Sequence, residues 1–195
     1  LEPVAWPPQI QNLKLACYTS GPEQISTQFL DEIVEQVNKA KMSITIGHMY
    51  FHPPKRLLEA LINASNRGVK ITLLTNRLDD QSPGCHFTHA ELTRYNAKSL
   101  FEGRDKPNVE VYEFRVPSTT YHKKVIVFDG KTTLLGSTNL GEKSLGSIDY
   151  EINFKVESEE FAAATAQSLE IDKTFCEKDS SPHISLKTRI FSSIQ

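Results

Sequence analysis

Several large classes of protein are disfavoured by what this sequence lacks. Lys and Arg number 22 against 24 Asp and Glu, and the net charge of −2 leaves none of the basic excess that nucleic-acid binders carry. No apolar run approaches the roughly 20 residues that cross a bilayer, and no signal peptide is visible. The cysteines Cys17, Cys85 and Cys176 are far apart and odd in number, which favours reduced thiols over a disulfide framework. We therefore expect a cytoplasmic or membrane-peripheral protein.

The 195 residues are enough for one domain with a buried core, and the 38% apolar and 24% charged contents are ordinary for a globular protein. Residues 1–12 are rich in proline and are expected to form an arm or linker. Residues 13–178 carry the pattern of a folded domain, and residues 179–195 are irregular in composition and are expected to form a tail. Because the chain starts without Met, one expectation is that it is a fragment of a longer protein.

Hydrophobic periodicity predicts an alternation of strands and helices. Short alternating or β-branched runs predict strands, and longer runs with apolar residues at helical spacing predict helices. The expected strands are 13–19, 43–51, 69–76, 109–114 and 152–158, and the expected helices are 25–41, 55–68, 159–178 and, on a weaker signal, 88–103. This alternation is typical of an α/β fold in which a mixed β-sheet is flanked by helices.

One stretch, "STTYHKKVIVFDGKTTLLGSTN" at residues 118–139, combines a strand pattern with reactive side chains. Side chains alternate between the faces of a strand, so His122 and Lys124 share one face while Lys123 and Val125 share the other. A lone histidine or lysine in a strand is usually structural. The combination of both at the head of an apolar run points to chemistry.

Asp129-Gly130 is a favoured two-residue turn for a β-hairpin. That turn would pair residue 122 with residue 137, and paired side chains point to the same side of a sheet. The predicted hairpin thus gathers four side chains on one surface: His122, Lys124, Ser137 and Asn139. Asp129 itself is then a turn residue some distance from His122, for which turn geometry or a buried salt bridge is expected before chemistry.

These four side chains suit a phosphate ester. Lys124 and Asn139 can hold the non-bridging oxygens, while an imidazole with an ordinary pKa of about 6.5 can attack phosphorus or protonate a departing oxygen. The other ring nitrogen needs a carboxylate or carbonyl to orient it, and Glu151 is a candidate, with Asp149 disfavoured by strand parity. One histidine cannot attack and protonate in the same step, so a second acid is required.

His122, Lys124 and Asp129 form the pattern H-x-K-x-x-x-x-D, followed by Gly-Ser and Asn139. This pattern resembles the HKD motif of the phospholipase D superfamily. The resemblance covers residues 13–178, where "LLEALINASNRGVKITLLTN" and "DYEINFKVESEEFA" are similar to the C-terminal half of bacterial phospholipase D and cardiolipin synthase-like proteins. Residues 48–51 depart from the Pro-Tyr-Phe run common in that branch. The resemblance implies a phospholipase D-like α-β-α sandwich.

The resemblance also implies a phosphodiesterase or phosphatidyltransferase that acts on phospholipid through a covalent phosphohistidine. The catalytic residues it implies are His122, Lys124, Asn139, Asp129 and Glu151. The phosphate-binding residues it implies are Lys124, Ser137 and Asn139. Glu151 would orient His122, and the family chemistry needs no metal and no other cofactor.

The chemistry of this family joins two such motifs at one active site, and this chain carries one. The other five histidines do not stand in H-x-K spacing: His48, His52, His86, His89 and His183. The second motif is therefore expected from the mate in a twofold homodimer or from another half of a longer protein.

Two alternatives stay open. The first is a nuclease of the same superfamily that uses the same residues on DNA or RNA and would need a basic groove near His122. The second is a catalytically incomplete half with an interaction role. Cys85, His86 and His89 invite a zinc site, but their ligand spacing is incomplete, and no metal is expected. A phospholipid substrate would allow peripheral membrane contact, although no basic amphipathic helix argues for it.

Overall fold

The structure of the chain is a computed structural model that describes residues 10, 13–23, 26–76, 93, 96–97, 100, 108–146 and 148–179. The predicted N-terminal arm, the predicted helix at 88–103 and the predicted C-terminal tail lie largely outside these residues.

An eight-stranded sheet forms the centre of the described structure, in the order β1-β9-β7-β6-β2-β4-β5-β10. Its strands are β1 (Lys14–Ser20), β2 (Ser43–His48), β4 (Lys70–Asn76), β5 (Val109–Phe114), β6 (Lys124–Phe128), β7 (Thr132–Gly136), β9 (Glu151–Glu157) and β10 (Cys176–Asp179). A second, two-stranded sheet joins β3 (Phe51–His52) to β8 (Leu140–Gly141).

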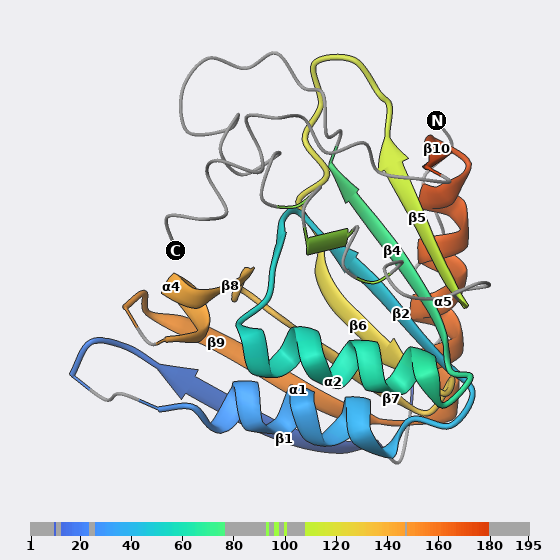
Figure 1. Ribbon diagram of the computed structural model, residues 1–195. Helices are drawn as coiled ribbons and strands as arrows, with labels where there is room; N and C mark the ends of the chain where they lie inside the picture. The colour runs from blue at the N-terminus through green and yellow to red at the C-terminus, as the bar shows by residue number, and fades with distance from the viewer. Residues whose placement is uncertain are drawn as a thin grey trace.

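The large sheet is mixed. Strands β2, β4 and β5 run parallel to one another, and the other neighbouring pairs are antiparallel. Because β6 is antiparallel to β2, the start of β6 lies beside the end of β2 (Figure 1). The carboxyl ends of parallel strands are where ligands gather in α/β sheets, so this edge is the natural place for a site.

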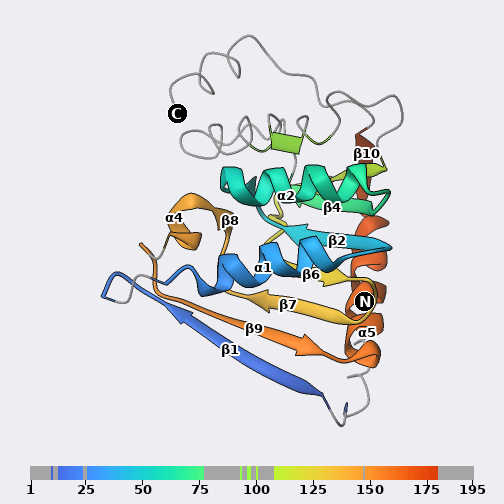
Figure 2. The ribbon, with the colours of Figure 1, turned by 60° about the horizontal axis from the view of Figure 1, so that its bottom comes forward.

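Helices cover both faces of the sheet. Helices α1 (Gln28–Lys39) and α2 (Lys55–Asn66) pack side by side on one face, and α5 (Glu159–Lys173) lies on the other (Figures 1 and 2). A short helix, α4 (Glu142–Leu145), follows β8. This arrangement confirms the predicted fold class, a mixed β-sheet flanked by helices.

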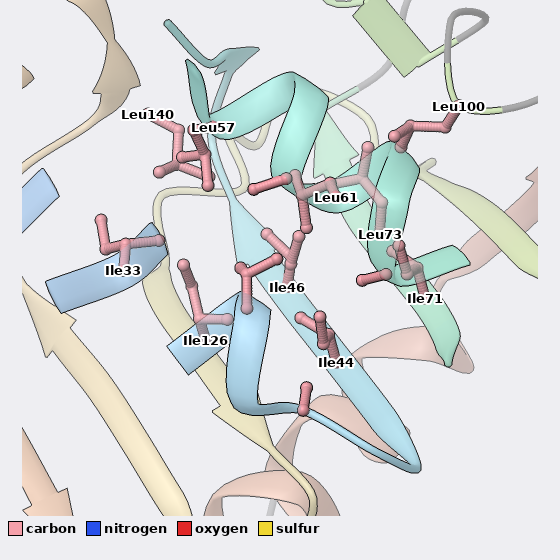
Figure 3. Close-up of a cluster of buried hydrophobic side chains, with 14 of the residues drawn as sticks. Ile33, Ile44, Ile46, Leu57, Leu61, Ile71, Leu73, Leu100, Ile126 and Leu140 are labelled. Carbon is pink, nitrogen blue, oxygen red and sulfur yellow. The ribbon is translucent and has the colours of Figure 1, made fainter. Parts of the chain in front are cut away.

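The main core lies between the sheet and the pair α1 and α2 (Figure 3). Because side chains alternate between the two faces of a strand, every second residue contributes to this core. Ile44 and Ile46 of β2 and Ile126 of β6 point to this face and are at most 3% exposed. Their neighbours Val125 and Val127 point to the other face and pack beneath α5. Fully burying one such side chain stabilises the fold by about 1.5–3 kcal/mol.

The β6–β7 hairpin corrects the predicted register by one residue. Phe128 pairs with Thr132, so the connection has three residues, and the predicted two-residue turn at Asp129-Gly130 is wrong. Asp129 and Gly130 have φ angles of 51° and 64°, a left-handed pair that Asp and Gly tolerate better than other residues. In this register residue 122 lies opposite residue 138, so the strand-parity argument for bringing residues 137 and 139 to His122 no longer holds.

Two predicted elements end earlier than expected. The predicted strand 43–51 breaks after His48, and Phe51 joins the small sheet instead. The predicted helix 159–178 ends at Lys173, and residues 176–179 form β10, which pairs with β5. Helical propensity alone favoured continuation, but the free edge of β5 offered backbone partners that the sequence pattern does not reveal.

Candidate active site

His122 and Lys124 meet where the sheet places the start of β6 beside the end of β2. The Lys124 Nζ lies 3.0 Å from His122 Nε2, and it also approaches the His122 carbonyl oxygen at 3.4 Å. An ammonium has only protons to give, so Nε2 accepts and the ring proton belongs on Nδ1. The shared orientation predicted for these two side chains is therefore observed, with His122 exposed and Lys124 half-buried.

The electrostatic surroundings of Lys124 include a carboxylate. Burial lowers the pKa of the Lys124 ammonium, and the charge of Glu151 opposes that shift without cancelling it. Glu151, the first residue of β9, is thus part of the same charged group of side chains.

Ser137 connects Glu151 to the backbone of β9. Its hydroxyl donates to Glu151 Oε2 and accepts a 2.9 Å hydrogen bond from the Ile152 N–H. The Ser137 N–H in turn donates to the Ile152 carbonyl at 3.0 Å. Among the described residues Glu151 makes no hydrogen bond to His122, so its predicted role in orienting His122 stays a prediction.

Gly136, the last residue of β7, leads directly into Ser137. A Cβ at this position would collide with Asn153 Oδ1 and with the Ile152 carbonyl oxygen. The glycine is therefore required by the close approach of β9. Asn153 is 2% exposed, and its side chain bonds Thr138 at both the backbone N–H (3.3 Å) and the hydroxyl (2.7 Å).

Asn139 lies one residue before β8, and its Oδ1 is buried without a hydrogen-bond partner. Within the described part of the chain it bonds neither to the His122–Lys124 pair nor to the Ser137–Glu151 pair. The structure thus joins four of the candidate residues in two contacts, His122 with Lys124 and Ser137 with Glu151, and the charges of Lys124 and Glu151 link the two contacts. It leaves Asn139 with an unused acceptor.

Asp129 and Asp149 are engaged elsewhere. Asp129 is at the opposite end of β6 from Lys124, where its carboxylate binds the backbone of residues 41–43. Asp149 accepts from Ser144 at 3.0 Å and pairs with Lys143 at 2.8 Å.

Asn76, the last residue of β4, was not singled out by the sequence. Its side chain accepts from the Tyr121 N–H at 2.7 Å and donates to the Tyr121 carbonyl at 3.1 Å. It also donates to the Met49 carbonyl at 3.1 Å. A polar residue at the carboxyl end of a parallel strand was the available signal. Asn76 fixes the backbone directly before His122 to the ends of β4 and β2.

Lys123 is tied to the opposite face. Its ammonium donates to Ser168 at 2.8 Å and pairs with Asp172 of α5, which also accepts from the Tyr121 hydroxyl at 3.0 Å. The two lysines of the motif region therefore anchor to different layers, and only Lys124 faces the candidate site.

Comparison with known proteins identifies the family. Residues 33–173 match the family described as "Cardiolipin synthase, PLD-like domain". This is most of the chain, so the protein belongs to the PLD-like domain family of the phospholipase D superfamily.

Curated relatives include cardiolipin synthase A of Yersinia pseudotuberculosis serotype O:1b (strain IP 31758) and of Yersinia pestis. Each is 26% identical to this chain over 148 residues, which is 76% of this chain and 28% of the relative. The chain thus spans little more than a quarter of the length of these relatives.

Solved structures share the fold. Nuc of Salmonella typhimurium, a phospholipase D family member, aligns with a TM-score of 0.65 and 20% identity over 87% of this chain and 100% of that chain. Phosphatidylserine synthase of Haemophilus influenzae Rd KW20 aligns with a TM-score of 0.74 and 11% identity over 95% of this chain and 46% of that chain. NucT of Helicobacter pylori aligns with a TM-score of 0.64 and 16% identity over 85% of this chain and 98% of that chain.

The described residues contain no group of three or more His, Cys, Asp or Glu side chains able to hold a metal ion. They also contain no helix long and apolar enough to cross a membrane. Cys85, His86 and His89, considered above for zinc, lie outside the described residues.

Proposed function

We propose that this protein is a phosphodiesterase of the phospholipase D superfamily that acts on phospholipid, by hydrolysis or by phosphatidyl transfer. The observation that carries the proposal is the contact between Lys124 Nζ and His122 Nε2, beside the linked pair of Ser137 and Glu151. A cation next to a nucleophilic nitrogen is what attack on an anionic phosphodiester requires. The similarity to cardiolipin synthase A supports a phospholipid substrate.

The reaction proceeds by two displacements at phosphorus. His122 attacks with an unprotonated ring nitrogen, a P–N bond forms, and the P–O bond to the leaving alcohol breaks as a second histidine protonates that oxygen. Water or another alcohol then attacks phosphorus, passes its proton to the second histidine, and breaks the P–N bond. Lys124 and Asn139 hold the non-bridging oxygens, Ser137 supports them, and Glu151 orients an imidazole.

The second histidine comes from a second HKD motif. A homodimer supplies it by symmetry, since a twofold interface brings each motif to its copy. Another half of a longer protein supplies it equally well. Alignment with all of the Nuc chain but only 46% of phosphatidylserine synthase fits both arrangements for a domain of this fold.

The test measures head-group release from mixed phospholipid micelles alongside cleavage of an oligonucleotide. His122→Ala and Lys124→Ala are expected to lower phospholipid turnover by about 10³-fold or more. The matched control is Lys131→Ala, which removes an exposed lysine at the other end of the same hairpin and leaves turnover unchanged.

Cleavage of the oligonucleotide alone, abolished by the same variants, would replace the proposal with a nuclease. The net charge of −2 speaks against that outcome for the chain as a whole. Turnover that survives His122→Ala would refute both.

A further inference from the structure

His48 is a second imidazole next to Lys124. It is the last residue of β2 and lies directly opposite Lys124 in the β2–β6 ladder. The adjacent rung is hydrogen-bonded, with the Met49 N–H donating to the Lys123 carbonyl at 3.1 Å. The rung of His48 and Lys124 is therefore the non-hydrogen-bonded kind, in which opposed side chains approach most closely and point to the same face.

The His48 ring is uncharged and incompletely bonded. Only 4% of the residue is exposed, and burial, reinforced by the charge of Lys124, lowers the pKa of His48 to about 3. Its Nδ1 is buried and has no hydrogen-bond partner. A buried polar atom left unpaired is a cost that folded proteins rarely carry without a purpose.

Lys124 must change partners during the proposed reaction. Its ammonium is hydrogen-bonded to His122 Nε2. The lone pair of that ring nitrogen has to be free to bond to phosphorus. An ammonium has three N–H donors, so Lys124 can hold a phosphate oxygen and still keep a protein acceptor. An acceptor opposite it on the same face is the neutral ring of His48.

We propose that His48 is a positioning residue for Lys124: its Nδ1 accepts a hydrogen bond from the ammonium when a bound phosphate draws Lys124 away from His122. This inference rests on the proposed function, because it assumes that Lys124 binds phosphate. It explains why a polar ring occupies a core position that continues the buried series of Ile44 and Ile46. A histidine with a purely structural role would be replaceable by an apolar aromatic ring without effect on phosphate binding.

The test is the affinity of the full chain for inorganic phosphate, measured by NMR titration, for the wild type and three variants. His48→Phe keeps an aromatic ring and removes the acceptor, and it is expected to bind phosphate about tenfold more weakly. His48→Asn places an amide oxygen where Nδ1 stood, and it is expected to bind within about threefold of the wild type. Lys124→Ala is expected to abolish binding, and thermal unfolding confirms that each variant is folded.

The outcomes separate the two proposals. Wild-type affinity in His48→Phe, or equal weakening in the Phe and Asn variants, overturns the role of His48 alone. Absence of phosphate binding by the wild type, or full binding by Lys124→Ala, overturns the proposed function and this inference with it.

A measurement that needs no His48 variant is the ¹⁵N resonance of His48 Nδ1, which is expected to shift on addition of phosphate to the wild type and not to Lys124→Ala. An unmoved resonance in a phosphate-bound wild type also overturns the inference.

Discussion

At the scale of single residues, Asp129 shows how a residue of the motif serves the fold. Its carboxylate accepts hydrogen bonds from the backbone N–H groups of Lys41 (2.9 Å), Met42 (2.8 Å) and Ser43 (2.9 Å), and its own N–H donates to the Ser43 carbonyl. Burial raises the pKa of this carboxyl, but the three backbone hydrogen bonds outweigh it, so the pKa lies below its ordinary value. Asp129 thereby fastens the β6–β7 turn to the start of β2.

Asp129→Asn is expected to destabilise the protein by about 1–3 kcal/mol at pH 7, because the amide keeps one acceptor oxygen but turns its nitrogen, a donor, toward a backbone N–H that the other carboxylate oxygen accepted. Since the folded pKa is lowered, the stabilisation by Asp129 is fully present above the unfolded pKa of about 3.9 and is lost as the pH falls through the folded value. Urea unfolding should therefore show a steeper loss of stability below pH 4 for the wild type than for the variant. Unchanged stability together with lost phosphate binding would instead place Asp129 in the chemistry.

At the scale of elements, Asn76 joins the ends of β4 and β2 to the segment that leads into β6. These three segments are far apart in the sequence, and the side-chain amide supplies the backbone hydrogen bonds that no strand partner provides there. The position of His122 therefore depends on the order of the central strands and on the side-chain amide of Asn76 at their carboxyl ends.

Asn76→Asp is expected to lower turnover by about tenfold or more, because a carboxylate would face the Tyr121 and Met49 carbonyl oxygens and displace the backbone before His122. Kinetics with saturating phospholipid, together with urea unfolding, separates this loss from unfolding. The matched control is Asn108→Ala, since Asn108 also donates to a backbone carbonyl, that of Gly68 at 2.9 Å, but before β5 at the opposite end of the sheet. Equal losses of turnover in both variants would contradict a specific role for Asn76.

At the scale of the whole molecule, the sequence contains one H-x-K-x-x-x-x-D pattern, and the proposed reaction needs two histidines. If a second copy supplies the other histidine, activity per chain rises with concentration as dimers form. A wild-type chain mixed in equal amounts with His122→Ala should, after exchange, leave about one quarter of the dimers with both histidines.

Measured activity in such mixtures, compared with the mass of the particle by light scattering, tests this arrangement. A linear decline of activity with the fraction of variant, or a monomer that is active by itself, would rule out a shared site. A folded monomer that is inactive by itself supports the second source, another half of a longer protein.

The elements predicted best from the sequence are those with the strongest local hydrophobic pattern. Residues 109–114 were predicted as a strand and form β5 with the same bounds, because alternation over a half-buried surface leaves few other solutions. The β6–β7 register was missed by one residue, because Asp129 is held by residues 41–43, which no local pattern reveals. Residue types could suggest His122, Lys124, Ser137 and Glu151, but not that Ser137 takes up the hydrogen bond of Glu151.

By itself the sequence determined the class of fold, the H-x-K-x-x-x-x-D pattern and the placement of His122 and Lys124 on one face, because periodicity and short spacing are local properties of the chain. Only the tertiary structure decided which residues surround that pair. Asn76 binds the backbone directly before His122, and His48 lies opposite Lys124, because β4 and β2 end beside the start of β6; Gly136 is required because β9 passes close by. These contacts arise between segments tens of residues apart, where packing and strand order, not local pattern, select the neighbours.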